Sequence, residues 1–494
     1  MKHKILFSFD GFFLHYCLAY YLQSYLNADF FGLIDINSKP KRFFENQTLV
    51  KFQKIWFFHD HIKKTNQEPD LDYLTNFEKK YKIDLWKLAI NERFFYLHNR
   101  FYKFKKQEIL SILEQESKLF ESILDEIKPD YFLTLFPVFH HQKLLLELCK
   151  AKRIKVLCAY GTGIANKMIL VEDGGTFDLD PNSIKNDSFN NKAIIVNEES
   201  NSYDSVFKNY LQNRTTTFLN KVKALKDYLF DFDSELTNSN FMYYGRSKFK
   251  VTKDALFLEL KRSRNYRFLK KHSTLSPDLS IPFVYFPMNV VEEMNLLYHA
   301  PYYTDQIEVI RHIAKSIPIN YVLYVKEHGA AVVRGWNSID YYKQMIDMPN
   351  VKLIHPSYDN DILIKNSKLV ITIRGTSALK AIRFGKPSIV FGEEPYRIMP
   401  SVFTVDSLNS LPNLIRTALN HKANPPDYEK YKELLDERAF ECNMFEFESN
   451  RDRTFYSGGI LSNVPISNTV MIDFLAKNEN LLSGIVSAHL KILT

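Results

Sequence analysis

The chain has 494 residues, of which 45% are hydrophobic and 25% charged, and its formal net charge is +8. That length exceeds one ordinary core, and this composition excludes a disordered or collagen-like chain, so we expect two large globular domains. Lysine and arginine are interspersed with acidic residues, which argues against a dedicated nucleic-acid binder and favours anionic small molecules or a lipid surface as partners.

Cysteine usage and hydropathy indicate the compartment. The four cysteines are widely scattered, without a CxxC pair or histidines at metal-ligand spacing, which predicts reduced thiols, no structural zinc and a cytoplasmic location. The apolar residues 1–22 are interrupted by Asp10, Gly11 and His15, so we expect a buried strand and helix there rather than a signal peptide. Any membrane association is then expected to be peripheral.

Apolar runs and helical periods alternate through the first half of the chain. Such alternation is typical of βαβ units with a parallel sheet. The predicted strands are 5–9, 30–36, 130–136, 154–159 and 168–171, and the predicted helices are 12–25, 107–127 and 141–150. We expect residues 41–102 to be helical in pieces.

The composition changes after Phe177, where Asn, Asp, Ser and Lys become abundant and long helical-looking stretches appear. This pattern predicts a helical insertion at about 178–275. Strands recur beyond it at 283–286, 321–325, 351–354, 369–373 and 388–391.

The predicted fold class is α/β, with two Rossmann-like domains facing across a cleft and a helical insertion. The predicted parts are an N-terminal domain at 1–275, a C-terminal domain at 281–425 and a segment at 426–494 that crosses back to the first domain.

Two motifs of the second half stand where strands end. Lys326, His328 and Gly329 follow the strand at 321–325, where N–H donors could meet a nucleotide phosphate and glycine would let the ligand approach the backbone. A solvated charged turn is the alternative reading of this stretch.

Arg374, Gly375, Thr376 and Ser377 follow the strand at 369–373 and open a helix. Thr376 and Ser377 are good N-cap residues, and free N–H groups at the positive end of a helix dipole favour an anion there. A plain helix cap without a ligand competes with this interpretation.

Acidic candidates lie in the first half. Glu172 and Asp173 precede a glycine at a strand end, where one carboxylate could act as general base on an acceptor hydroxyl. Asp10, Gly11 and His15 lie at the first strand-to-helix turn, which is a favoured ligand position. An ordinary turn and a helix start explain these two groups equally well.

The second half resembles the capsular and surface polysaccharide glycosyltransferases of GT-B fold, including capsule β-Kdo transferases and, more distantly, bacterial sialyltransferases. The resemblance rests on four stretches over roughly 283–410: Lys326 to Gly329, Asn350 to Pro356, Ile371 to Ala381 and Gly385 to Phe391.

The resemblance implies that the domain at 1–275 is the acceptor-side domain and that the domain at 281–425 is the nucleotide-sugar-binding domain. It also implies roles for several residues. It assigns the general base to Glu172 or Asp173, and binding of the nucleotide's phosphate to His328 and to the Gly375-Thr376-Ser377 turn. Two residues depart from the family pattern, since Gly329 replaces a proline and Lys380 stands where many relatives have a glutamate that holds ribose.

The sequence thus leads us to expect a metal-independent glycosyltransferase of capsule or lipopolysaccharide biosynthesis, cytoplasmic and at most peripheral at the inner face of the membrane. It would transfer Kdo or another nonulosonate from a CMP donor to a glycan or glycolipid acceptor, with no cofactor and no nucleic-acid partner. An NDP-hexose-dependent transferase, an inactive nucleotide or glycan binder, and a sugar-nucleotide epimerase are the alternatives.

Overall fold

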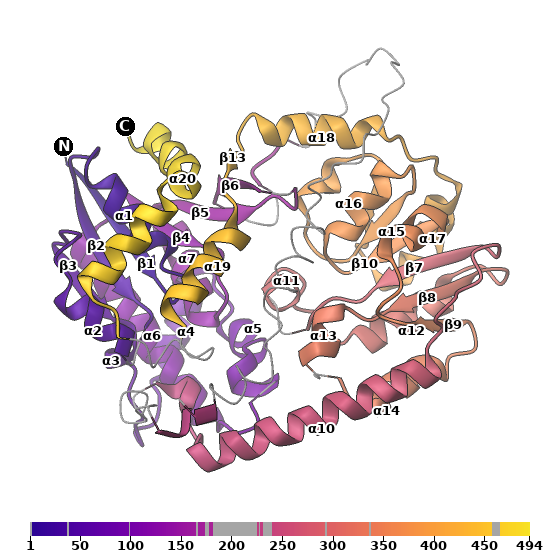
Figure 1. The fold of residues 1–494 in the computed structure, drawn as a ribbon, viewed down its shortest axis with the longest axis horizontal. Coiled ribbons are helices and arrows are strands. Elements are labelled where there is room, and N and C mark those ends of the chain that lie inside the picture. Colours follow the sequence, from indigo (N-terminus) through magenta and orange to yellow (C-terminus); the bar gives the residue numbers. More distant parts are fainter. Residues whose placement is uncertain are drawn as a thin grey trace. The chain divides into compact units, whose positions relative to one another are not determined.

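The computed structural model describes residues 2–36, 39–97, 99–164, 166–172, 177–180, 225–226, 228–230, 240–291, 294–334, 337–456 and 465–494. These residues divide into two compact units. Unit 1 falls within Met1–Glu172, Asn197–Lys250 and Arg438–Thr494, and unit 2 falls within Asp173–Val196 and Val251–Glu437. Each unit is an α/β structure around its own sheet, so the prediction of an α/β fold with two Rossmann-like units is confirmed (Figure 1).

The sheet of unit 1, within the described residues, has seven strands in the order β13-β6-β5-β4-β1-β2-β3. Five of them run parallel, whereas β6 and β13 run antiparallel to their neighbours. The strands are β1 His3–Phe9, β2 Ala28–Ile34, β3 Lys54–Phe57, β4 Tyr131–Leu135, β5 Lys155–Gly161, β6 Lys167–Val171 and β13 Phe440–Glu441.

Helices cover both faces of this sheet. They are α1 Leu14–Leu22, α2 Lys39–Asn46, α3 Phe58–His61, α4 Leu71–Tyr81, α5 Leu85–Ile90, α6 Lys106–Ile127, α7 His140–Ala151, α19 Met444–Phe455 and α20 Asn468–Leu493. Side chains of β1 alternate between two cores: Phe7 and Phe9 belong to the core under α1 and α20, and Leu6 belongs to the core under α6 and α7. A parallel strand buried on both faces reads as an unbroken apolar run, which is why β1 was predictable.

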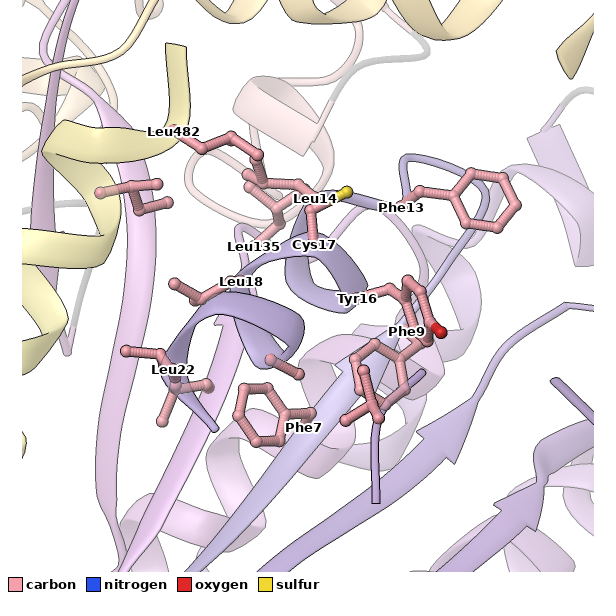
Figure 2. Packing of buried hydrophobic residues seen from close by; sticks show 14 of the residues in the cluster. Phe7, Phe9, Phe13, Leu14, Tyr16, Cys17, Leu18, Leu22, Leu135 and Leu482 are labelled. Atoms are coloured by element: carbon pink, nitrogen blue, oxygen red, sulfur yellow. The ribbon is translucent and has the colours of Figure 1, made fainter. Parts of the chain in front are cut away.

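Figure 2 shows the core beneath α1, where Phe7, Phe9 and Leu135 of the sheet meet Leu18 of α1 and Leu482 of α20. The helix α1 is apolar around most of its circumference because the sheet lies on one side and α20 on the other. Residues far apart in the sequence therefore build one core.

The sheet of unit 2 has, among the described residues, six parallel strands in the order β12-β11-β10-β7-β8-β9. Its strands are β7 Phe283–Pro287, β8 Val322–Lys326, β9 Val351–Ile354, β10 Leu369–Thr372, β11 Ser388–Val390 and β12 Val402–Thr404. Its helices are α11 Met294–Leu297, α12 Gln306–Ser316, α13 Gly329–Arg334, α14 Ile339–Ile346, α15 Asn360–Asn366, α16 Thr376–Arg383, α17 Leu411–Asn420 and α18 Pro426–Asp436. This strand order is that of a doubly wound dinucleotide-binding fold.

Two expectations from the sequence need correction. The region 41–102 contains a parallel edge strand, β3, and not only helices. The strand predicted at 168–171 exists as β6 but runs antiparallel to β5. The predicted insertion at 178–275 lies largely outside the described residues, and its described part holds α10, Lys248–His272.

The four cysteines are buried thiols, in agreement with the sequence. Across the described parts of the chain, no helix has both the length and the apolar character that crossing a bilayer requires.

Gly484 lies in α20, where the helix packs directly on the backbone of β13. A Cβ atom added at Gly484 would lie 2.1 Å from the carbonyl oxygen of Glu441. Gly484→Ala should therefore lower the free energy of unfolding by roughly 1–3 kcal/mol, although alanine normally stabilises a helix relative to glycine. Chemical denaturation measures the change.

Gly161→Ala is the matched control, because a Cβ atom at Gly161 would meet nothing within 4 Å. Equal stability of the Gly484→Ala variant and the wild-type protein would show that α20 does not press on β13 in solution.

Candidate functional site

The carboxyl ends of β7, β8 and β10 bring the donor-side candidates of unit 2 to one edge of the sheet. The strand order reverses between β7 and β10, and ligands of open α/β sheets bind outside the carboxyl ends of strands at such a switch point. Asn289, just after β7, donates its Nδ2–H to the carbonyl of Arg374 at 2.5 Å, so the ends of β7 and β10 are tied together.

The turn after β10 is fixed by Glu394, which follows β11. One carboxylate oxygen of Glu394 accepts from Arg374 Nε at 3.0 Å and from the Gly375 N–H at 2.6 Å. The Tyr396 hydroxyl donates to the Gly375 carbonyl at 2.6 Å. Because Arg374 is only 2% exposed, its guanidinium holds the turn from inside the protein.

Glycine is required in this turn. Gly375 has φ 124°, which side-chain-bearing residues rarely adopt, and it is the N-cap of α16. The sequence predicted Thr376 or Ser377 as the cap, but they are the first two helical residues. No side chain caps α16, so the N–H groups of its first turn face outward from the helix end, beside the Thr376 and Ser377 hydroxyls.

Lys326 ends β8 as predicted, but its side chain is only 7% exposed. Its ammonium donates to Oδ1 of Asn360 at 2.6 Å, and the Tyr285 hydroxyl donates to the same oxygen at 2.8 Å. Lys326 therefore contributes positive charge at the carboxyl edge of the sheet from a fixed, mostly buried position.

His328 is half-buried, and its Nδ1 accepts from the Ala330 N–H at 3.2 Å. In the neutral ring the proton then sits on Nε2, which makes Nε2 a donor. Gly329 is exposed, and a Cβ added there would meet nothing within 4 Å, so the backbone at this point is open.

Glu327, which stands between Lys326 and His328 in the sequence, is buried and supports this turn. It accepts from the His328 N–H at 2.8 Å, from Asn337 Nδ2 at 2.5 Å and from the Tyr342 hydroxyl at 3.3 Å. Burial raises the pKa of Glu327 to about 7 against the effect of these hydrogen bonds. Lys380, which departs from the family pattern, forms an ion pair with Asp361 at 3.1 Å.

In unit 1, Asp10 lies just after β1 at the equivalent switch point, between β1 and β4. Its Oδ1 accepts from the Phe12 N–H at 2.9 Å, which shapes the turn at Gly11. Burial raises the pKa of Asp10 to about 6, and the nearby charge of Asp35 acts in the same direction.

A network of histidines surrounds Asp35 at the ends of β2, β3 and β4. Asp35 Oδ2 lies 2.8 Å from His141 Nε2, and Oδ1 lies 3.0 Å from His59 Nε2. Burial alone would raise the pKa of Asp35, but His141 and His59 outweigh it and hold the pKa well below its ordinary value. Asp35 therefore stays ionised, which disfavours ionisation of Asp10.

His140, beside this network, lies between two carboxylates. Its Nδ1 is 2.9 Å from Glu92 and its Nε2 is 2.9 Å from Glu116, and all three side chains are 0% exposed. Burial alone would lower the pKa of His140, but Glu116 and Glu92 raise it to about 10. His140 is thus an imidazolium in the core.

Glu116, His140 and His141 could each offer one ligand atom to a metal ion, with these atoms within 4.8 Å of one another. Both ring nitrogens of His140 already lie within hydrogen-bond distance of carboxylate oxygens. The contacts of His140 in this cluster are therefore explained by N–H hydrogen bonds to Glu92 and Glu116.

Two of the remaining predicted residues, Glu172 and His15, lie elsewhere in unit 1. Glu172 is exposed just after β6, and because β6 runs antiparallel, its end points away from the edge where β1 and β4 end. Asp173 lies outside the described residues. His15 is 3% exposed in α1, and burial lowers its pKa to about 3, with the charge of His489 adding to this effect.

Several residues of this site were not singled out from the sequence. Asp35 was placed inside a strand predicted to run to residue 36, whereas β2 ends at Ile34. His59 follows β3, which was not predicted, so the sequence offered no signal for His59. His141 follows the predicted strand that became β4, so a polar residue after a strand end was the signal available for it. Glu394 carried the same signal, since it follows β11.

Glu394→Gln should lower the free energy of unfolding by roughly 3–5 kcal/mol, because it removes the charged partner of a buried guanidinium. The adjacent Glu393 is exposed, so Glu393→Gln, which makes the same chemical change, should leave stability unchanged. Denaturation of both variants measures the difference, and equal stabilities would contradict a structural role for the Glu394–Arg374 pair.

Comparisons with known proteins add to this geometry. Several solved structures resemble the chain weakly. One is a β-Kdo 2,7-transferase, KpsC of Thermosulfurimonas dismutans, which matches at 12% identity and a TM-score of 0.31, over 81% of this chain and 98% of that one. The UDP-GlcNAc 2-epimerase of Methanocaldococcus jannaschii matches at 14% identity and a TM-score of 0.24, over 88% and 100% of the two chains. The spinosyn rhamnosyltransferase SpnG matches at 10% identity and a TM-score of 0.28, over 92% of this chain and 100% of that one. At these values the resemblances assign no chemistry to the chain.

A comparison with curated protein sequences finds no match. Residues 212–401 match the family model described as capsule polysaccharide biosynthesis protein. This segment includes Lys326, His328 and the turn from Arg374 to Ser377. The match confirms the resemblance to capsular polysaccharide proteins that these motifs carry.

Proposed function

We propose that the protein is a glycosyltransferase of surface polysaccharide biosynthesis that takes a sugar from a nucleotide donor and transfers it to a glycan or glycolipid acceptor. The observation that carries this proposal is the gathering of N–H donors and positive charge at the switch point of unit 2, within the segment that matches capsule polysaccharide biosynthesis proteins. A dinucleotide-type sheet with an uncapped helix at that edge suits a nucleotide phosphate.

Unit 2 would hold the donor. His328 Nε2–H, the N–H groups of the first turn of α16 and the Thr376 and Ser377 hydroxyls would donate to the phosphate, while Lys326 adds charge. Arg374 acts as a positioning residue, because its guanidinium is engaged with Glu394. As the sugar–phosphate bond breaks, these donors would stabilise the charge that develops on the leaving oxygen.

Unit 1 would supply the general base. Asp10 supports this role best, because it is a half-buried carboxylate at the switch point of its sheet and its pKa lies near the working range of an enzyme. Glu172 and Asp173, the bases that the family resemblance implies, are the rival assignment. Burial would keep the Asp10 pKa raised, and the charge of Asp35 would add to this effect.

The donor we favour is a CMP-linked nonulosonate such as CMP-Kdo, handled without a metal ion, as the resemblance implies. An NDP-hexose donor, a non-catalytic binder and a nucleotide-sugar epimerase remain the alternatives. Incubation of the protein with a donor alone separates them: slow hydrolysis supports a transferase, an epimerised sugar supports the epimerase, and binding without turnover supports the binder.

His328→Ala should weaken nucleotide binding by roughly 10- to 100-fold, because a hydrogen bond to a charged phosphate is lost. Thermal shift with CMP, UDP, GDP and ADP measures the affinity and the base preference together. His312→Ala, at a half-buried histidine of α12, is the control and should bind like the wild type. Stabilisation by UDP or GDP with none by CMP would overturn the CMP assignment, and no stabilisation by any nucleotide would overturn the donor site.

Asp10→Asn should reduce the transfer rate by roughly 10²- to 10⁴-fold, because a general base is lost. A base must be ionised, so the wild-type rate should fall as the pH drops below about 6, the raised pKa of Asp10. Asp72→Asn, at an exposed aspartate, should leave the rate unchanged.

Glu172→Gln decides between the two assignments of the base. If Glu172→Gln abolishes transfer and Asp10→Asn retains it, the base is Glu172 and the role given to Asp10 is wrong.

A further inference from the structure

The helix α10 has an unusual composition for a helix of a globular protein. Its 25 residues are KFKVTKDALFLELKRSRNYRFLKKH. Nine lysines and arginines against two acidic residues give it a net charge of +7, nearly the whole excess of +8 that the chain carries. Charges are therefore interspersed along most of the sequence, as expected, but not in α10.

One side of α10 is fixed against unit 2. Asn265 Nδ2 donates to the carbonyl of Asn337 at 2.6 Å, and Leu269 is fully buried in the unit 2 core. These two residues are four apart, so they lie on the same face of the helix. The opposite face must point away from that core.

Large apolar side chains of α10 lie exposed, three of them on the outward face and Phe257 on its flank. Phe249 is 76% exposed, Leu256 and Leu260 are each 63% exposed, and Phe257 is 59% exposed. Phe249, Leu256 and Leu260 are spaced by seven and four residues, so they form one stripe along the helix. Four such residues on one short surface are not the scattered exposed apolar residues that every protein shows.

Basic residues continue the same stripe. Arg264 and Arg267 lie four and seven residues beyond Leu260, and Lys271 lies seven beyond Arg264, so all three fall on the side of the apolar residues. All three side chains are exposed. Figure 1 shows α10 as one long unbroken helix, so the apolar half and the basic half follow each other along a straight surface.

We propose that α10 docks the protein on an anionic phospholipid surface, lying in the plane of the interface. The apolar stripe would enter the boundary between headgroups and acyl chains, and the basic residues would contact the phosphates. A nucleic acid offers phosphates but no apolar layer for Phe249, Leu256, Phe257 and Leu260, so lipid is the partner that fits both halves. This proposal does not depend on the glycosyltransferase activity.

Co-sedimentation of the purified full-length protein with vesicles tests the docking. The protein should bind vesicles of phosphatidylglycerol and phosphatidylcholine in equal parts, should bind phosphatidylcholine alone far more weakly, and should be released by high salt. The variant Arg264→Gln/Arg267→Gln/Lys271→Gln should bind the anionic vesicles roughly 100-fold more weakly, since each lost charge costs about fivefold in affinity.

The matched control is Lys51→Gln/Lys368→Gln/Lys422→Gln, which removes three exposed charges elsewhere on the chain and should bind like the wild type. Leu256→Gln/Leu260→Gln should weaken binding to anionic vesicles without a change in net charge. Thermal unfolding at the wild-type temperature shows that each variant is folded.

Four results would overturn the proposal. The first is the absence of binding to anionic vesicles, and the second is equal loss of binding in the control variant. The third is that Leu256→Gln/Leu260→Gln changes the oligomeric state in size-exclusion chromatography while vesicle binding persists, because the stripe would then be covered by a second copy of the chain. Tighter binding to duplex DNA than to vesicles at the same salt would likewise assign α10 to another partner.

Discussion

The candidate donor site depends on one buried carboxylate. Oε1 of Glu394 receives both the guanidinium of Arg374 and the N–H of Gly375, so a residue after β11 fixes the backbone after β10. A buried charge pair of this kind adds little net stability, but it strongly disfavours any arrangement that separates its partners. The left-handed turn at Gly375 and the outward direction of the α16 N–H groups follow from it. If this turn binds the donor's phosphate as proposed, its geometry is fixed before the ligand arrives, which lowers the ordering cost of binding.

Most of the parallel strands of both sheets could be predicted because they read as apolar runs, but the three-residue strand β12 was not among the predicted strands. The edge strand β3 was missed, since four residues, Lys54–Phe57, are too few to show a period in an aromatic-rich region. The direction of β6 could not be predicted either. An apolar run has the same pattern in both directions, and only the short connection between β5 and β6, which allows an antiparallel pair, distinguishes them.

The two halves of the candidate site differed in how much of each could be predicted from the sequence. Lys326 to Gly329 and Arg374 to Ser377 are continuous motifs after strands, so local reasoning found them. Asp35, His59 and His141 come from three strand ends far apart in sequence, and their mutual contacts exist only once the sheet is ordered. His140 shows the limit most clearly: nothing near it in sequence indicates the charge that Glu92 and Glu116 give it.

The packing of α20 on β13 bears on how the chain folds as it is synthesised. The Tyr21 hydroxyl donates to the Leu475 carbonyl across 454 positions of sequence, and β13 pairs with β6. Domains usually fold in the order in which they leave the ribosome, amino-terminal first. Here the described part of unit 2 is nearly contiguous in sequence, whereas the amino-terminal sheet waits for residues 438–494. The face of this sheet that α20 later covers would stay exposed until translation passes that point. A chaperone, or fast completion of the chain, would have to protect it.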